Sequence, residues 1–198
     1  MLEFRNITLK DDLKNIGRLL YYTDPYIYPA FFGNIEYAEC IIEAAIKKSI
    51  YCFNTQDIFC TFIDDMPVGM ICVNPEGKRK WINEDWIRLL VDMRFKKTDC
   101  FQCVSEKYFE PMNNEKFENQ IYILALSVLP SMRGNTIGKQ MLQKFLEKYS
   151  EKQVVLDTLE NNLSAIALYK KHGFKEIKKY IGFCTEGLGP NCLRMIKG

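Results

Sequence analysis

The sequence has a single histidine and almost no net charge. That histidine is His172, and 27 basic residues against 25 acidic ones leave a formal charge of +2. No block of five like charges occurs in the chain. Because patches of one sign usually accompany binding to nucleic acid or to an anionic membrane, we expect neither partner.

The chain also lacks a long apolar run. The longest, at positions 121–130, is far shorter than the roughly 20 residues that a membrane-spanning helix needs. The opening stretch MLEFRNITLKDD holds neither an apolar signal core nor a small-residue cleavage site. These absences predict a cytoplasmic protein.

Metal ligands are scarce as well, although the chain has eight cysteines. They are Cys40, Cys52, Cys60, Cys72, Cys100, Cys103, Cys184 and Cys192. Most stand inside apolar segments, where a cytosolic protein keeps cysteines reduced and buried. Cys100 and Cys103 form a CxxC pair, but no second pair or nearby histidine completes the four ligands of a zinc site. We therefore expect no metal site.

The order of the predicted elements is that of a mixed α/β fold. The chain has 198 residues, 47% of them apolar, which suits one domain with a substantial core. We expect strands at 4–7, 120–130, 153–158, 174–183 and 192–198, a hairpin over 57–74, and helices after Thr8, over 34–49, after Thr136 and over 161–174. Thr8 is expected to cap the first helix, with Asp11 at the capping-box position. The aromatic stretch 21–33 is expected to break the helix, because it holds two prolines and a glycine.

Residues 75–116 differ from their surroundings. The stretch 84–95 has helical periodicity, and 99–112 is a candidate for a second short helix. The segment is too short for a core of its own. We interpret it as a helical insertion between the third and fourth strands of a single domain that spans residues 1–198.

A glycine turn follows the central strand and opens a helix. Gly134 and Gly138 are separated by three residues, and Gln140 follows Lys139, so the turn is one residue too short for a Walker A loop and lacks its magnesium-binding hydroxyl. The G-x-G-x-x-G pattern of dinucleotide-binding loops is absent too. What remains is Arg133 and two glycines at a helix N-terminus, an arrangement that favours anions. A turn that only connects strand to helix stays an alternative.

A second pattern lies about thirty residues further on. Asn162, Ala165, Ile166 and Tyr169 share one face of a predicted helix. That face begins with an amide and ends with a phenol, whereas a pure core stripe would be apolar throughout. An edge asparagine and a packed tyrosine are the simpler interpretation of this helix alone.

Together, LSVLPSMRGNTIGKQML and NNLSAIALYKKHGF resemble the acetyl-CoA motif and the following motif of the GCN5-related N-acetyltransferase (GNAT) superfamily. The recognisable motifs cover roughly residues 122–174, and the element order extends the resemblance over the chain. The resemblance implies a GNAT-like mixed sheet flanked by helices, with acetyl-CoA as co-substrate. One residue departs from the pattern, because Thr136 stands where the family has glycine.

The resemblance also implies a set of site residues. Tyr169 matches the family's general acid, which protonates the leaving thiolate. The expected cofactor-binding residues are Leu126, Ser127, Val128, Arg133, Gly134, Asn135, Thr136, Ile137, Gly138, Lys139, Asn162 and Ala165. No general base is evident: Glu118 precedes the central strand, Asp157 ends the next strand, and His172 stands where it suits a helix end.

The function implied is transfer of an acetyl group to a primary amine of a small molecule or peptide. In this family the first two helices and their loop wall the acceptor site, and here that loop is rich in tyrosine and phenylalanine. The insertion at 75–116 is a candidate lid or homodimer contact. Two alternatives remain: a non-catalytic acyl-CoA-binding or regulatory module on the same fold, which Thr136 and the missing base favour, and a nucleotide-binding P-loop protein.

Overall fold

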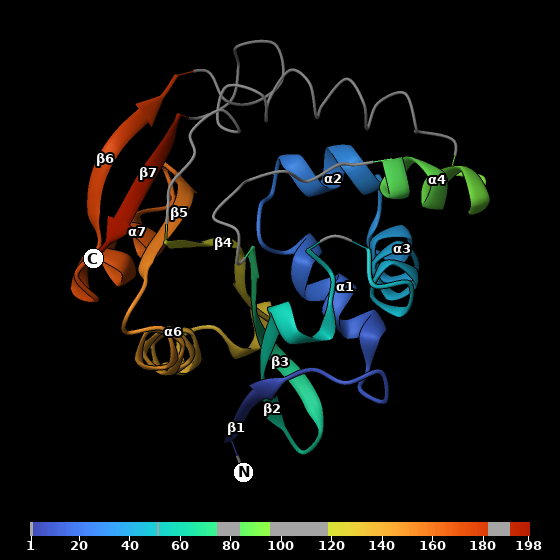
Figure 1. The fold of residues 1–198 in the computed structure, drawn as a ribbon, viewed down its shortest axis with the longest axis horizontal. Helices are drawn as coiled ribbons and strands as arrows, with labels where there is room; N and C mark the ends of the chain where they lie inside the picture. Colours follow the sequence, from blue (N-terminus) through green and yellow to red (C-terminus); the bar gives the residue numbers. More distant parts are fainter. Residues whose placement is uncertain (1, 51, 75–83, 96–118, 182–190) are drawn as a thin grey trace.

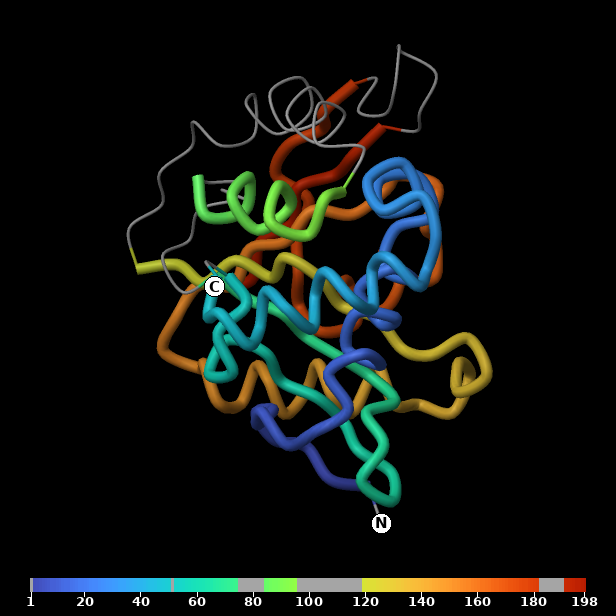
Figure 2. The backbone as a smooth tube through the Cα atoms, turned by 90° about the vertical axis from the view of Figure 1, so that its right-hand side faces the viewer, coloured from blue at the N-terminus to red at the C-terminus, as the bar shows by residue number. Residues whose placement is uncertain are grey.

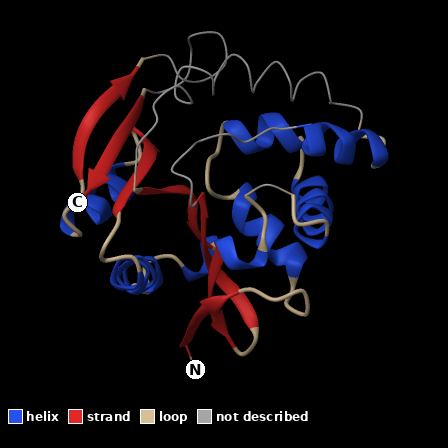
Figure 3. Ribbon diagram, in the orientation of Figure 1, coloured by secondary structure: helices blue, strands red, loops and turns tan. Residues whose placement is uncertain are grey.

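Seven strands form one sheet with helices on both faces (Figure 3), as seen in a computed structural model that describes residues 2–50, 52–74, 84–95, 119–181 and 191–198. The strands are β1 (Leu2–Asn6), β2 (Ile58–Ile63), β3 (Met66–Asn74), β4 (Gln120–Val128), β5 (Gln153–Leu159), β6 (Lys175–Tyr180) and β7 (Cys192–Lys197). They lie in the order β1-β2-β3-β4-β5-β7-β6, in which β4 and β5 are parallel and the other neighbours antiparallel. The predicted mixed α/β fold is confirmed.

The helices lie in two layers, one on each side of the sheet (Figure 1). One layer contains α1 (Leu13–Tyr21), α2 (Ile27–Phe32), α3 (Ile35–Lys47) and α4 (Glu84–Asp92), and the other contains α6 (Ile137–Lys148) and α7 (Leu163–Lys171). Each layer encloses its own apolar core. Ile16 and Leu19 of α1 are fully buried in the first core, and Phe145 of α6 is fully buried in the second. The central strands β2 to β5 are therefore buried between the two helical layers, whereas most of β6 is exposed.

The first helix begins later than its sequence predicts. Asp12 caps α1 by accepting a hydrogen bond from the backbone N–H of Asn15 over 3.1 Å. Thr8 does not cap the helix; its own backbone N–H donates to the Asp11 carboxylate over 2.6 Å. That carboxylate also pairs with Arg5, whose hydrogen bond holds the pKa of Asp11 below its usual value. Thr8 and Asp11 thus close a turn ahead of the helix, because the Thr8 hydroxyl also donates to that carboxylate over 3.1 Å and is not used as a helix cap.

The aromatic stretch after α1 contains a short helix, α2, which was not predicted because the stretch holds two prolines. Pro29 is the third residue of α2, and a proline in the first turn of a helix removes no intrahelical hydrogen bond. Asn34, the first residue of the helix predicted over 34–49, then caps α3 through a 2.9 Å hydrogen bond from Tyr37 N–H. The prolines therefore bend the path of the chain without preventing helix formation.

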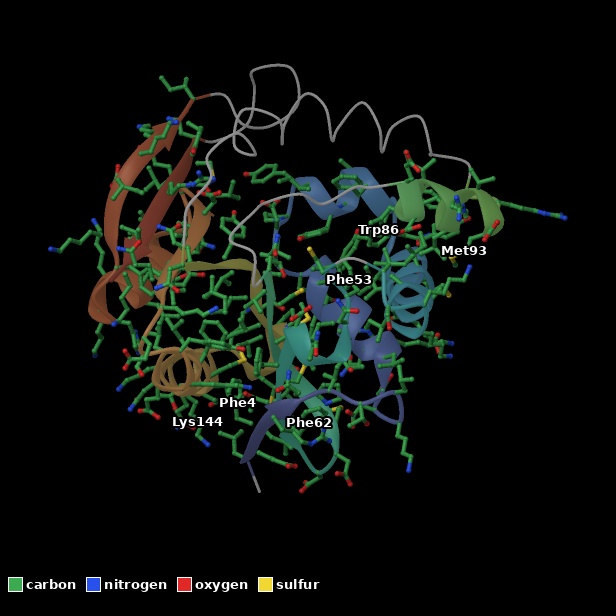
Figure 4. The ribbon with its side chains drawn as sticks, in the orientation of Figure 1. Phe4, Phe53, Phe62, Trp86, Met93 and Lys144 are labelled. Atoms are coloured by element: carbon green, nitrogen blue, oxygen red, sulfur yellow. The ribbon has the colours of Figure 1, made fainter. Side chains whose placement is uncertain are left out.

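Helix α4 is the described part of the predicted insertion. Trp86 of α4 is buried and meets Phe53 edge-to-face with 5.3 Å between ring centres (Figure 4). This contact fixes α4 beside α3. The predicted second helix at 99–112 and the CxxC pair at 100–103 lie outside the described residues.

The described residues include neither a membrane-spanning helix nor a cluster of metal ligands. None of the described helices has the length and apolarity needed to cross a bilayer. Within the same part of the chain, no three His, Cys, Asp or Glu side chains are grouped closely enough to hold a metal ion.

Candidate active site

The two central parallel strands part halfway along their length. Their pairing runs from Gln120–Gln153 to Ile123–Leu156 and then ends, although β4 continues to Val128 and β5 to Leu159. On its other edge, β4 stays paired with β3 as far as Val128. The edge of β4 that faces β5 therefore carries backbone groups that have no partner in β5. Such an edge can hydrogen-bond to an extended ligand that carries amide groups.

A bulge in β4 marks the point of divergence. The register between β3 and β4 shifts at Cys72 and Val73, so that Leu124 is the extra residue. Ile121 and Ile123 pack in the α6 core, whereas Leu124 and Ala125 both pack in the α1 core. Bulges bend a strand and redirect its backbone groups. This bulge turns the second half of β4 away from β5.

An open cleft of about 910 Å³ occupies the space beyond the divergence. Its lining includes eleven of the twelve predicted cofactor-binding residues: Leu126, Ser127, Val128, Arg133, Gly134, Thr136, Ile137, Gly138, Lys139, Asn162 and Ala165. Asn135 is exposed and is not part of the lining. Figure 2 shows the loop after β4 on the same side of the molecule as α2. The predicted residues thus come together around one cleft.

A smaller cavity of about 120 Å³ continues from the cleft between the parted strands. Thr23 and Asp24, which precede α2, line one end, and Leu168 and Tyr169 of α7 line the other. Because α2 and α7 cover opposite faces of the sheet, the cavity passes through the sheet itself. The parted strands therefore leave a channel where groups from the two faces can meet.

The loop before α6 holds an unusual backbone conformation. Thr136 has φ 60° and ψ 0°, the left-handed region that suits glycine and is a genuine outlier for a β-branched residue. Gly134 has φ 86°, and a Cβ there would meet nothing within 4 Å. Thr136 thus adopts the positive φ angle despite its side chain.

The first residues of α6, directly after Thr136, have backbone N–H groups without intrahelical partners. The first intrahelical bond of α6 runs from Gln140 N–H to Thr136 O over 3.0 Å. By helix geometry, the N–H groups of Ile137, Gly138 and Lys139 precede that bond and point out of the helix end, where they attract anions. The start of α6 therefore has the free backbone donors that the predicted anion site requires.

Two of the predicted cofactor residues direct their side chains elsewhere. Ser127 Oγ donates to Leu19 O over 2.5 Å, and Arg133 Nη2 donates to Tyr22 O over 3.3 Å. Both acceptors belong to the C-terminal end of α1. No sequence pattern pairs residues so far apart, and these contacts were not predicted.

Asn162 forms the start of α7. Its Oδ1 accepts from Ala165 N–H over 3.3 Å and from Ser164 Oγ over 3.1 Å. The residue lines both the cleft and the inner cavity. It is therefore a helix cap whose remaining amide group faces the site.

Tyr169 lies at the inner end of the channel. Its side chain is buried against Phe174, with 5.7 Å between ring centres, and lines the 120 Å³ cavity. Burial raises the pKa of the Tyr169 phenol, so the group stays protonated across the physiological range. Among the described residues, nothing hydrogen-bonds its hydroxyl. The proton is thus available to a group that enters the cavity.

The candidate bases differ in position. Asp157 is buried, and its two carboxylate oxygens accept from Arg194 Nε at 2.9 Å, Arg194 Nη2 at 3.0 Å and the Tyr122 hydroxyl at 2.6 Å. His172 Nδ1 lies 2.8 Å from Leu168 O, at the end of α7. Glu118 lies outside the described residues. Asp157 therefore serves a buried ion pair beside the cavity, and His172 serves a helix end.

The two partners of Asp157, the Tyr122 hydroxyl and the Arg194 guanidinium, were not predicted. Tyr122 and Arg194 stand in apolar strands, and neither was singled out as a motif position. The one available signal was the charge itself, because arginine in a strand that reads as buried needs a carboxylate partner.

Comparisons with known proteins agree with this geometry. The model described as "Acetyltransferase (GNAT) family" matches residues 27–174. An N-alpha-acetyltransferase of Sulfurisphaera tokodaii is 34% identical over 70 residues, which make up 33% of this chain and 42% of that protein. The chain thus matches less than half of that relative's length.

Solved structures share the fold at low sequence identity. An N-acetyltransferase from Staphylococcus aureus Mu50 has a TM-score of 0.74 at 18% identity, over 98% of this chain and 100% of that one. Arabidopsis thaliana Naa50, in complex with the bisubstrate analogue CoA-Ac-MVNAL, has a TM-score of 0.60 at 17% identity, over 100% of this chain and 98% of that one. At such identities the likeness concerns the fold alone.

Proposed function

Because the chain belongs to the acetyltransferase (GNAT) family, we propose that it moves an acetyl group from acetyl-CoA to a primary amine, which attacks the thioester directly. The predicted class, an acyl-CoA-dependent acetyltransferase, is confirmed at the level of the family. The observation that carries the finer proposal is the channel through the sheet, because it lets a thioester and an amine meet between β4 and β5.

The residues around the cleft suit coenzyme A. The unpaired edge of β4 at Leu126–Val128 offers backbone groups to the amides of the pantetheine arm. The N–H groups of Ile137, Gly138 and Lys139 suit the pyrophosphate, and the Thr136 hydroxyl adds a donor. The open space at Gly134 allows phosphate oxygens to approach the backbone closely. Arg133 and Lys139 bring positive charge to the same wall of the cleft.

The reaction needs one bond made and one broken. The amine nitrogen bonds to the acetyl carbon, the carbon–sulfur bond breaks, and the amine releases its proton to water. A backbone N–H near Leu126 would polarise the thioester carbonyl. The Tyr169 hydroxyl would give its proton to the departing thiolate and recover one from solvent. The ordinary pKa values of a phenol and a thiol are close, at about 10 and about 8.5 to 9. Burial raises the pKa of Tyr169, and a thiolate that forms in the same cavity loses water as well, so its pKa would rise in the same direction and the proton transfer would stay matched.

We propose the α-amino group of a peptide as the acceptor to test first. The relative at 34% identity is an N-alpha-acetyltransferase, and one solved structure of the same fold carries a peptide joined to CoA. Such an acceptor would enter from the α2 side, past Tyr22, Pro25 and Tyr26, which line the mouth of the cleft. These apolar side chains suit the side chain that follows a peptide amine.

Calorimetric titration of the purified chain with acetyl-CoA, CoA and Mg-ATP tests the cofactor assignment. We expect micromolar binding of the two CoA ligands and none of Mg-ATP. Thiol release is then followed with short peptides that carry a free α-amine, with the same peptides blocked by N-acetylation, and with small-molecule amines. Thiol release that is equal with free and blocked peptides would rule out the peptide acceptor.

A non-catalytic acyl-CoA-binding module is the second candidate. Thr136 in a conformation that suits glycine, and Asp157 committed to Arg194, both favour it over a fully equipped enzyme. Tight acetyl-CoA binding without turnover on any amine of the panel would support it.

Four features stay predictions. They are the single domain over residues 1–198, the insertion at 75–116 as a lid or dimer contact, the homodimer itself, and the cytoplasmic location. Sedimentation of the purified chain decides the oligomeric state.

A further inference from the structure

The C-terminal end of α1 is held by side chains from the cofactor side of the cleft. Ser127, near the end of β4, donates through Oγ to Leu19 O over 2.5 Å and is itself buried. Arg133, at the start of the glycine turn, donates through Nη2 to Tyr22 O over 3.3 Å and through Nε to Val128 O over 3.1 Å. These bonds join residues that are 108 and 111 positions apart in the chain.

This arrangement satisfies groups that a helix leaves open. The last carbonyls of a helix have no intrahelical partner and carry partial negative charge. Hydroxyl and guanidinium donors relieve both conditions, and the guanidinium adds a favourable interaction with the helix dipole. The two side chains therefore stabilise the end of α1 in one position relative to β4.

The residues that follow α1 form the acceptor side of the channel. We define the acceptor wall as residues 21–29. Of these, Thr23 and Asp24 line the inner cavity, and Tyr22 and Tyr26 line the cleft. Arg133 binds the carbonyl of Tyr22, which is the second residue of this wall. A shift of Arg133 is therefore transmitted directly to the wall.

We propose that Ser127 and Arg133 form a clamp that positions the acceptor wall against the cofactor strand. The proposal rests on the proposed function, and it makes both side chains positioning residues. Arg133 stands at a place that suits a phosphate ligand, yet two of its guanidinium nitrogens are committed to backbone carbonyls. Its main effect is then on acceptor binding and on the order of the wall, while coenzyme A is held by the backbone of the turn.

Hydrogen exchange on the full chain without ligand is the first test. The variants are Arg133→Met, Arg133→Lys and Ser127→Ala. Lys139→Met is the matched control, because Lys139 carries a like charge in the first turn of α6 and lines the same cleft. Loss of a hydrogen bond near 1.4 kcal/mol corresponds to about tenfold faster exchange. We expect this increase at the amides of Tyr22, Thr23 and Tyr26 in Arg133→Met and Ser127→Ala, and no increase in Lys139→Met.

Ligand binding separates the clamp from a phosphate contact. For Arg133→Met we expect about a tenfold rise in the acceptor KM and less than a threefold change in the Kd for CoA. Arg133→Lys keeps the charge but lacks the planar fork, so it should behave like Arg133→Met. Lys139→Met should weaken CoA binding and leave the acceptor KM unchanged.

The opposite pattern overturns the clamp. Unchanged exchange in residues 21–29 together with about tenfold weaker CoA binding, restored by Arg133→Lys, would make Arg133 a phosphate ligand instead. Exchange is measured without cofactor. A wild type that failed to bind CoA would therefore remove the proposed function, while the exchange data would still decide whether the clamp holds the wall.

Discussion

Gln140 donates a hydrogen bond from its side-chain amide to the Thr136 hydroxyl over 3.2 Å, one turn back along α6. Because Oγ1 is the acceptor, the hydroxyl proton of Thr136 is left for another partner. The same residue holds φ 60°, a conformation that costs a non-glycine residue about 1–2 kcal/mol. The two observations together make Thr136 a strained residue with a donor beside the proposed phosphate site.

Replacing Thr136 should separate strain from function. Thr136→Gly should raise the free energy of unfolding by ~0.5–1 kcal/mol, because relief of strain exceeds the entropy that glycine adds to the unfolded chain. The same variant should weaken CoA binding by about tenfold, because one hydrogen bond to a phosphate is lost. Thr136→Ser keeps the hydroxyl and should keep the affinity. Tighter CoA binding by Thr136→Gly would show that the hydroxyl is no ligand.

Tyr169→Phe should lower turnover and leave cofactor affinity nearly unchanged. Loss of a positioned proton donor typically costs ~10²–10⁴ in rate, whereas the phenyl ring still fills the cavity wall. Single-turnover rates and calorimetric titration with acetyl-CoA measure the two effects separately. The matched control is Tyr149→Phe, which removes a phenol of raised pKa at the far end of α6. Equal turnover in both variants would remove Tyr169 from the mechanism.

Tyr169 should also make the fold sensitive to alkali. Its folded-state pKa is raised by burial above the unfolded value of about 10. The folded state therefore keeps the proton where the unfolded chain loses it, and stability falls as the pH rises above about 10. The difference in unfolding free energy between wild type and Tyr169→Phe should be constant below that pH and shift against the wild type above it. A difference that is flat from pH 8 to 11.5 would contradict this.

Arg194→Met should be strongly destabilising. The guanidinium forms a buried ion pair with Asp157, and its removal takes away the two Arg194 donors while the Tyr122 hydroxyl stays at 2.6 Å from the carboxylate. Breaking a buried pair on one side typically costs about 3–5 kcal/mol. Urea unfolding measures the loss, and the double variant with Asp157→Asn should recover part of it. Lys47→Met breaks an exposed pair with Glu43 and should cost less than about 1 kcal/mol.

The sequence is most informative where local rules decide the structure. Continuous apolar runs predict β4 and β5, and the 3.6-residue spacing of Ile137, Met141 and Phe145 predicts α6. Asn34 caps α3 because capping involves neighbours only. Thr8 fails as a cap because its backbone N–H and hydroxyl both donate to Asp11 in a turn ahead of the helix. The same carboxylate also holds Arg5, a contact that depends on how β1 lies against the following loop.

In the candidate site, too, local motifs are predictable from the sequence, whereas contacts between distant segments are not. The glycine turn and the Asn162 helix are local motifs, and most of the residues that they mark line the cleft. The contacts of Ser127 and Arg133 with α1 arise from the packing of distant segments, and no local pattern encodes them. The bulge at Leu124 likewise depends on the register between β3 and β4. Fine positioning therefore has to be observed in the folded chain.

The parting of β4 and β5 has a consequence for the chain as a whole. Every described strand up to Val128 lies on one side of the divergence, and every strand from Gln153 onward lies on the other. The sheet thus consists of two antiparallel parts, one from each half of the sequence. They are joined only where β4 and β5 pair, over four residue pairs at one end of the boundary between them. A ligand that lies where β4 and β5 no longer pair contacts both parts of the sheet and links them to each other. Cofactor binding should therefore stabilise the packing of the two halves of the chain against each other, in addition to the loop that contacts its phosphates.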